Sequence, residues 1–186
     1  MQLSKIFKEY NIEYVFNYAA EPYIPECFER PMHFFDINAT AVLKVLNACE
    51  MSNIKGLLQV SSAEIYGDMK GKISESDPIT PHSTYGVSKA AADGLVQVRW
   101  REAKVPSIAL LENGEFGEVY NMGSEGGIKI YELAHLIGEL MGHTEVNINV
   151  DEARVRPWEI WHLQSDNTKL YKAIGNKVPT SLRIAL

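Results

Sequence analysis

The sequence predicts an α/β fold in which a parallel sheet is covered by helices. Short apolar runs that end in small or polar residues alternate with longer segments whose apolar residues recur at helical spacing. This alternation is typical of a parallel sheet, because parallel strands need a crossover connection that is usually a helix. The last third of the chain lacks this alternation of apolar runs and helical segments. We therefore expect a parallel α/β core followed by a small lobe.

The first part of the core is predicted to run helix, strand, loop, helix, strand. Residues 1–10 have apolar side chains at helical spacing, and residues 14–18 form a short aromatic and β-branched run that favours a buried strand. Three prolines break residues 21–31 into a loop. A helical apolar stripe covers residues 34–51, and residues 56–61 form a second apolar run that predicts another buried strand.

The second part begins with a polar segment rich in glycine and proline, residues 68–81, which we expect to be a loop at the active site. Residues 84–103 predict a long helix, and residues 106–111 predict a third parallel strand. A polar turn at residues 112–115 ends the core. An amphipathic helix is expected at residues 130–141.

Composition excludes several classes of function. The 186 residues are 46% apolar and 23% charged, as in ordinary globular proteins, and the net charge of -6 gives no reason to expect nucleic acid or an anionic membrane as partner. Cys27 and Cys49 fit reduced thiols, with Cys49 expected in the core. No stretch is long enough to span a membrane, no signal peptide is evident, and the histidines lack metal-ligand spacing. We expect a soluble, cytoplasmic, metal-free protein.

Tyr85 and Lys89 are the most informative residues for chemistry. Residues four apart lie on one face of a helix, so the phenol and the ammonium can enter a single pocket. A nearby ammonium favours the phenolate, which suits a tyrosine that moves a proton. Ser62, at the end of the second apolar run, can donate a hydrogen bond to the same substrate oxygen. An isolated pair of this spacing is more often a solvated helix face, so the surrounding motifs decide.

Four motifs in the same order resemble the extended short-chain dehydrogenase/reductases, and more narrowly the NAD-dependent nucleotide-sugar epimerase/dehydratase family. They lie at residues 15–20, 38–40, 60–67 and 85–89, and the resemblance covers roughly residues 10–111. It implies a partial Rossmann-like, doubly wound parallel sheet with NAD as the cofactor. In the second motif, Asn38 matches an asparagine that ties a helix to the neighbouring strand.

By this resemblance, Tyr85 is the acid/base for the C4 hydroxyl of the sugar, and Lys89 holds the nicotinamide ribose. Ser62 would hydrogen-bond the sugar oxygen as it becomes a ketone; the alternative is a plain cap at a strand end. Small side chains at Ala19 and Ala20 would let the cofactor approach the backbone, unless they only serve packing. The cofactor-binding positions implied are Ala19, Ala20, Ser61, Tyr85 and Lys89.

Glu64 bears on the choice of reaction. Dehydratases of the resembled family carry an acid at this position, where it removes the proton next to the transient C4 ketone, and nucleotide-sugar decarboxylases carry Glu there too. Ala63, however, stands where many dehydratases have an acidic or hydroxylic residue. The resemblance thus ranks 4,6-dehydratase first, then 4-epimerase, then decarboxylase. An exposed glutamate before a turn is the non-catalytic alternative for Glu64.

Residues 154–159 and 165–170 resemble the carboxy-terminal signature of the family. Arg156 matches an arginine that grips the diphosphate of the sugar nucleotide, with Arg154 as a helper, and Glu159 matches an acid near its ribose. A guanidinium suits this role because its fork matches phosphate oxygens; a surface arginine is the alternative. The resemblance implies a nucleotide-diphosphate sugar as substrate and a homodimer in the full-length parent.

The family pattern is incomplete in this sequence. No Gly-x-x-Gly-x-x-Gly loop, which cradles the cofactor pyrophosphate, occurs in the 186 residues, and the family's segment after about residue 111 is missing. We expect residues 1–111 to form a partial NAD-binding domain and residues 112–186 a remnant of the substrate lobe. The chain is then a fragment that binds NAD weakly or not at all, or a relative that obtains the missing half from a partner. The strand at residues 14–18 would form an exposed apolar edge.

Overall fold

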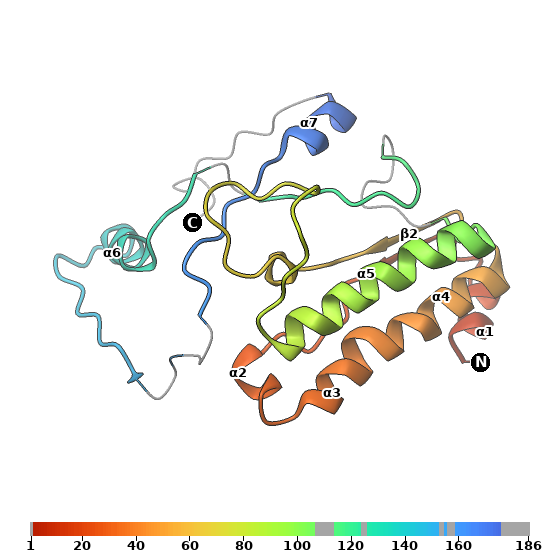
Figure 1. Cartoon of the computed structure of the whole chain (residues 1–186), viewed down its shortest axis with the longest axis horizontal. Coiled ribbons are helices and arrows are strands. Elements are labelled where there is room, and N and C mark those ends of the chain that lie inside the picture. The colour runs from red at the N-terminus through yellow and green to blue at the C-terminus, as the bar shows by residue number, and fades with distance from the viewer. Residues whose placement is uncertain (1, 107–113, 124–125, 153–154, 156–158, 176–186) are drawn as a thin grey trace.

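The computed structural model describes residues 2–106, 114–123, 126–152, 155 and 159–175 (Figure 1). Two strands, β1 (Tyr14–Asn17) and β2 (Gly56–Gln59), pair in parallel, with Tyr14 opposite Gly56 and Asn17 opposite Gln59. The connection between them contains α2 (Ile24–Cys27), α3 (Pro31–Phe35), the π-helical turn η1 (Asp36–Thr40) and α4 (Ala41–Ser52). This is the helical crossover that a parallel pair requires.

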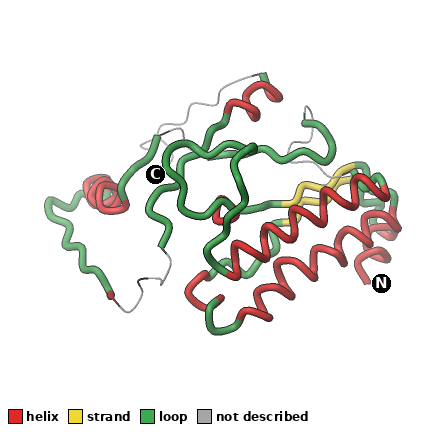
Figure 2. Tube along the Cα trace, in the orientation of Figure 1, coloured by secondary structure: helices red, strands yellow, loops and turns green. Residues whose placement is uncertain are grey.

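One face of the sheet is covered by α4 and by the long helix α5 (Thr84–Ala103), which lie side by side (Figure 2). Val15 of β1 and Leu57 of β2 pack against Val42 and Leu46 of α4 and Ala92 of α5. The helix α1 (Gln2–Glu9) packs on α4. The main core of the described residues therefore lies between this sheet face and the two long helices.

The four predicted helices are confirmed. Residues 1–10 contain α1, residues 84–103 form α5, and residues 130–141 contain α6 (Ile130–Leu140). The stripe at residues 34–51 extends from the end of α3 through η1 and most of α4. The predicted loop at 21–31 holds the short α2, with Pro25 in its first turn, where a missing N–H costs nothing. Among the described residues, no helix is both long and apolar enough to cross a membrane.

The prediction that residues 14–18 form a buried strand is right about the strand and wrong about its burial. Tyr14, Phe16 and Tyr18 are 48%, 51% and 69% exposed, whereas Val15 faces the helices. Successive side chains of a strand point to opposite faces, so Tyr14 and Phe16 share the face opposite to that of Val15. Within the described residues β1 pairs only with β2, so its other edge is unpaired, as the sequence predicts.

A third strand at residues 106–111 remains a prediction, because all but its first residue lies outside the described residues. Pro106 accepts a hydrogen bond from the backbone N–H of Leu57 at 2.7 Å. The N–H of Val60 bonds to Asn17 of β1, so the N–H of Leu57, three residues earlier, points to the opposite edge of β2. The chain thus returns beside β2 on the side where a third strand is expected.

Backbone and side-chain hydrogen bonds at Ile73 join the chain after the core to the loop before α5: Ile73 bonds the backbone of Gln164 and Asp166, and Asn121 Nδ2 donates to its carbonyl. Ile73 forms an isolated parallel bridge with Ser165, and Asn167 hydrogen-bonds both the N–H and the carbonyl of Gly123. The last helix, α7 (Thr168–Ile174), begins directly after Asn167. The described residues 118–123 form no strand.

Cys27 and Cys49 are both buried, and neither forms a disulfide. Cys49 lies in the main core, as its place in the helical stripe predicts. Burial raises the pKa of the Cys49 thiol to about 12, so it is a packing residue and not a nucleophile.

Two glycines of α5 allow a matched test of how closely this helix approaches the end of β2. A Cβ on Gly86 would lie 2.8 Å from the Glu64 carbonyl oxygen and 2.8 Å from Pro81 Cβ, whereas a Cβ on Gly94 would meet nothing within 4 Å. We expect Gly86→Ala to destabilise the fold by roughly 1–3 kcal/mol through overpacking. Gly94→Ala should stabilise it by roughly 0.5–1 kcal/mol through helix propensity. Urea denaturation measures both, and equal effects of the two substitutions would contradict the close approach.

Candidate active site

The first turn of α5 is fixed against the segment that follows β2. Ser83 is its N-cap, and its Oγ accepts a hydrogen bond from the N–H of Gly86 at 3.0 Å. Gly86 also lies against the Glu64 carbonyl in the 3₁₀ turn η2 (Ala63–Ile65). A side chain at position 86 would separate these backbones. The glycine thereby brings its neighbour Tyr85 close to the turn that carries Glu64.

Tyr85, Lys89 and Asp93 follow one another at four-residue spacing on one face of α5. Their exposed fractions are 8%, 3% and 8%. A solvated helix face, the alternative reading of the Tyr85–Lys89 pair, is therefore wrong. This face instead turns toward the end of β2, where Lys89 and Asp93 each contact the backbone or side chain of the strand end.

Lys89 is anchored to the last residue before the candidate serines. Its Nζ donates a hydrogen bond to the carbonyl oxygen of Val60 at 2.6 Å. Burial lowers the pKa of Lys89 below its usual value, because desolvation disfavours the charged ammonium, and the Asp93 carboxylate acts in the opposite direction. The ammonium is thus held at the strand end, within the fold.

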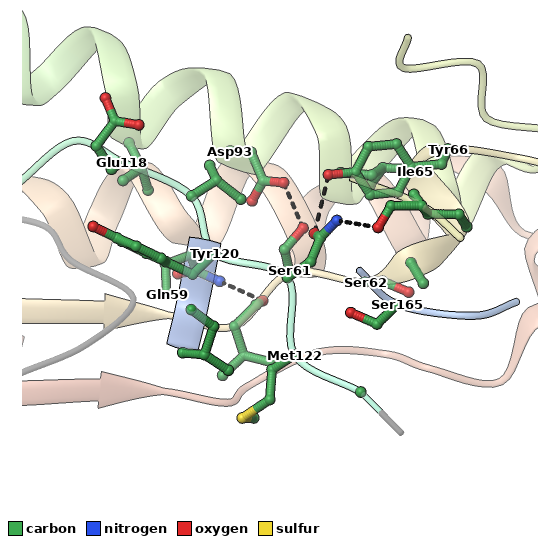
Figure 3. Close-up of a pocket in the computed structure, with 18 of the residues that line it drawn as sticks. Gln59, Ser61, Ser62, Ile65, Tyr66, Asp93, Glu118, Tyr120, Met122 and Ser165 are labelled. Atoms are coloured by element: carbon green, nitrogen blue, oxygen red, sulfur yellow. Dashed lines mark hydrogen bonds between the residues drawn. The ribbon is translucent and has the colours of Figure 1, made fainter. Parts of the chain in front are cut away.

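Asp93 forms the second link between α5 and the strand end. Its Oδ2 accepts a hydrogen bond from Ser61 Oγ (Figure 3). Burial raises the pKa of Asp93 to about 6, and the Ser61 hydrogen bond and the Lys89 charge only partly offset this. Ionising Asp93 is therefore unfavourable in the folded protein relative to water, yet the carboxylate is mostly charged at neutral pH.

Ser62 and Glu64 lie on the turn η2, directly after the anchored residues. Ser62 Oγ accepts a hydrogen bond from the N–H of Glu64 at 3.3 Å, so Ser62 does cap the turn. Accepting that bond leaves its O–H group able to donate, and its side chain is only half-buried. Glu64 is 9% exposed, which contradicts the alternative of an exposed glutamate before a turn.

Ala19 and Ala20 lie in a loop after β1 that is held at both ends by asparagines. Asn17 Oδ1 accepts from the N–H of Ala19 at 3.3 Å. Asn38 accepts from the N–H of Glu21 at 2.8 Å and donates to its carbonyl at 3.1 Å. Between these anchors Ala19 is exposed and Ala20 half-buried. The packing alternative for Ala19 is therefore not supported, and a bound group could approach the backbone here.

Asn38 is also linked, through Ser88, to the backbone of Tyr85 on α5. Its Nδ2 donates to Ser88 Oγ at 3.1 Å, and Ser88 Oγ donates to the carbonyl of Tyr85 at 2.7 Å. The Tyr85 side chain packs with buried Cys27 and Phe34. The sequence predicted that Asn38 ties a helix to the neighbouring strand; it ties η1 to the loop after β1 and, in addition, to α5.

A pocket of about 420 Å³ opens beyond Ser61 and Ser62, between the end of β2, α5 and the segment around Asn121 (Figure 3). Tyr66 closes part of its wall by donating to Asn121 Oδ1 at 3.1 Å, and Asn121 Nδ2 in turn donates to the Ile73 carbonyl at 3.1 Å. Burial is the main reason that the pKa of Tyr66 lies above its usual value. The Tyr66 phenol thus links the end of η2 to the segment around Asn121.

Of the predicted site residues that the structure describes, only Ser61 and Ser62 line this pocket. Glu64, Tyr85, Lys89, Ala19 and Ala20 do not, although α5 and η2 pack together. Asp93, which sequence reasoning missed, lines it as well. Its signal was present in the sequence, because Asp93 continues the four-residue spacing of Tyr85 and Lys89.

The predicted substrate-binding pair is only half described. Arg156, and Arg154 as its helper, lie outside the described residues. Glu159 is half-buried, and its Oε1 accepts from the N–H of Ile160 at 3.2 Å. Glu159 does not line the pocket. Among the described residues, no group of three or more histidine, cysteine or acidic side chains could hold a metal ion.

The raised pKa of Asp93 predicts a pH-dependent stability that an amide would not share. Because the folded state binds this proton more tightly than the unfolded chain, the stabilisation is complete below pH 4 and is lost as pH rises through about 6. Between pH 4 and 7, the unfolding free energy of wild type minus that of Asp93→Asn should fall by on the order of 3 kcal/mol. Glu102→Gln, an exposed carboxylate on α5, is the control. A pH-independent difference for Asp93→Asn would contradict the buried titration.

Comparison with known proteins places most of the chain in one family. The sequence profile described as GDP-mannose 4,6 dehydratase matches residues 1–115. A UDP-glucose 4-epimerase of Lactobacillus helveticus is 35% identical over 95 residues, covering 50% of this chain and 29% of the relative. A dTDP-D-glucose 4,6-dehydratase of Homo sapiens is 28% identical over 113 residues, covering 60% of this chain and 32% of the relative. The chain thus spans about a third of the length of these relatives.

Solved structures match the fold over nearly the whole chain. A UDP-glucuronic acid 4-epimerase from Bacillus cereus, in complex with UDP-glucuronic acid and NAD, has a TM-score of 0.85 at 17% identity, covering 98% of this chain and 74% of the other. DesIV, a dTDP-glucose 4,6-dehydratase from Streptomyces venezuelae with NAD bound, has a TM-score of 0.80 at 17% identity, covering 98% and 72%. These matches confirm a partial Rossmann-like α/β fold. The chain belongs to the NAD-dependent nucleotide-sugar epimerase/dehydratase family, within the group described by GDP-mannose 4,6 dehydratase.

Proposed function

We propose that this chain carries the proton-transfer half of an enzyme that modifies a nucleotide-diphosphate sugar through a 4-keto intermediate with NAD as cofactor. The observation that supports this most is the buried Tyr85–Lys89 face of α5, anchored to the end of β2 next to Ser62 and Glu64. Burying the Lys89 ammonium is costly even with the Val60 carbonyl and the Asp93 charge as partners, because desolvation disfavours its charge. This cost and the family membership favour the same reading.

In this proposal Tyr85 takes the proton of the sugar C4 hydroxyl, and Lys89 supplies the positive charge that favours the phenolate. Ser62 donates its O–H to the C4 oxygen as that oxygen becomes a ketone. NAD, when bound, supplies the chemistry of a hydride acceptor. Ala63–Ile65 forms a rigid turn after Ser62, which would keep the serine and Glu64 in a fixed relation.

The residues present fit the nicotinamide end of NAD. Lys89 would hold the ribose, Ser61 would lie near it, and the exposed Ala19–Ala20 loop would leave space against the backbone. The glycine-rich loop that would hold the pyrophosphate has no counterpart in these 186 residues. We therefore infer a site that contacts only part of the cofactor.

Glu64 favours 4,6-dehydration among the possible reactions. A carboxylate held in the turn next to Tyr85 could remove the proton beside the C4 ketone, since the ketone acidifies that C–H bond. Ala63 offers no acid for the leaving hydroxyl, so 4-epimerisation is the second candidate and decarboxylation the third. Relatives of both the epimerase and the dehydratase type are consistent with this order.

The remaining parts of the proposal concern the substrate lobe and the assembly. Residues 1–111 would form the cofactor-binding domain and residues 112–186 the remnant of the nucleotide-sugar lobe. Arg156 would bind the diphosphate, and Glu159 would lie near the ribose. We also propose a cytoplasmic enzyme that is a homodimer in its full-length form.

A non-catalytic role is the competing class. The exposed aromatic residues Tyr14, Phe16 and Tyr18 on β1 would suit a remnant that associates with another chain. The two readings differ in whether Lys89 and the Ala19–Ala20 loop respond to NAD.

Titration of NAD into the labelled 186-residue chain, followed by backbone NMR, separates the two. We expect binding weaker than about 1 mM, equivalent to about 4 kcal/mol, because only the nicotinamide end has partners. The amides of Ala19, Ala20, Ser62 and Lys89 should shift, and Lys89→Met should abolish the shifts. Lys104→Met, at the exposed residue that caps the C-terminus of the same helix, should preserve them. Shifts confined to other regions, or none at millimolar NAD, would favour the non-catalytic class.

The reaction itself can be read from product mass. With NAD at millimolar concentration and a panel of nucleotide sugars, dehydration removes water, decarboxylation removes carbon dioxide, and epimerisation leaves the mass unchanged. We expect slow loss of water, abolished by Tyr85→Phe and retained in Tyr10→Phe, which changes an exposed tyrosine. Loss of water that survives Tyr85→Phe would contradict the assigned proton transfer.

A further inference from the structure

Two consecutive residues at the end of β2 are held by two residues of α5 that lie one helical turn apart. Lys89 Nζ bonds the Val60 carbonyl at 2.6 Å, and Asp93 Oδ2 accepts from Ser61 Oγ. Ser62 follows immediately along the chain. Any shift of Asp93 relative to Ser61 would therefore move the candidate serine relative to Lys89.

A hydrogen bond alone does not explain a carboxylate at position 93. The oxygen of an asparagine could accept the same bond from Ser61 without the cost of a buried charge. What the carboxylate adds is a negative charge beside Lys89, four residues earlier on the same helix face. The unfavourable burial of this charge suggests that it has a role beyond stability.

The surroundings leave Lys89 as the cation that acts on Asp93. From the turn after β2, Ser61 donates to Asp93, and Tyr66 is a neutral phenol near it. From the segment across the pocket, Glu118 is paired with Lys169 at 2.7 Å. The Asp93 carboxylate therefore acts electrostatically on the Lys89 ammonium.

We propose that Asp93 is a positioning residue whose carboxylate keeps the Lys89 ammonium charged and holds the Ser61–Ser62 strand end against α5. Its meaning for catalysis rests on the proposed function, because Lys89 is there the charge that favours the Tyr85 phenolate. The Asp93–Lys89 coupling itself is a property of the chain without cofactor or substrate. Below about pH 6, Asp93 becomes neutral and this support of Lys89 is lost.

The test is NMR of the lysine side-chain ammonium and Cε groups in the labelled chain without NAD. In wild type, the Lys89 signals should show an inflection near pH 6, when Asp93 ionises, and a second one when Lys89 itself titrates. Asp93→Asn should remove the first inflection and lower the Lys89 pKa by about one unit or more, a tenfold change in proton affinity. Asp93→Glu should restore most of the Lys89 pKa.

Glu102→Gln is the matched control. It removes an exposed carboxylate from the same helix, at a position more than three turns away from Lys89. If Asp93 has only a structural role, Asp93→Asn will leave the Lys89 pKa unchanged, as Glu102→Gln is expected to do. That result would overturn the proposal. If Asp93→Asn does not fold, the wild-type inflection at Lys89 and the Asp93→Glu variant decide the question. Absence of that inflection also overturns it. Neither result depends on NAD binding or turnover, so failure here is distinguishable from failure of the proposed function.

Discussion

The hydrogen bond from the Lys89 ammonium to the Val60 carbonyl is the interaction on which the candidate site depends. It joins α5 to Val60, the residue between the end of β2 and the serines Ser61 and Ser62. Gly86 allows the same helix to approach Glu64 one turn earlier, and Asp93 adds a link one turn later. Contacts from three successive turns of α5 thus fix the position of this helix face relative to the segment that carries Ser62 and Glu64.

This arrangement is held at some cost to stability. Burial disfavours the charges of both Lys89 and Asp93, and each only partly offsets the penalty of the other. Hydrogen bonds between uncharged groups also hold the site together. Asn38 makes three of them, two to the backbone of Glu21 in the loop after β1 and one to Ser88, which in turn bonds the Tyr85 carbonyl. A polar network of this kind at a strand end is typical of a functional site and not of a packing core.

The sequence was a good guide wherever local periodicity decides structure. The helices α1, α4 and α6 follow from apolar residues at helical spacing, and the parallel pairing of β1 and β2 follows from the strand–helix alternation. The burial of β1 was mispredicted, because an aromatic run indicates a strand but not how many of its faces are covered. Coverage depends on which other elements pack on the sheet, and local sequence does not carry that information.

In the candidate site, too, local sequence patterns predicted some features, whereas features that depend on long-range contacts were missed. Motif spacing predicted that Tyr85 and Lys89 share one helix face. It did not extend to Asp93, whose contact with Ser61 joins residues far apart in the sequence. The pocket near Asn121 likewise depends on long-range hydrogen bonds that no local pattern indicates. The catalytic and binding roles of all the predicted site residues, Tyr85 and Lys89 included, remain predictions from the resemblance.

The most direct test of the account is the rate at which Lys89 is acetylated in the native chain, compared with exposed Lys104 at the other end of α5. If the ammonium is locked to Val60, reaction requires local opening, and Lys89 should react at least about tenfold more slowly, corresponding to about 1.4 kcal/mol of protection. Peptide mass spectrometry over a time course gives both rates in one sample. Equal rates would show that Lys89 is free in solution and that α5 is not anchored to the strand end.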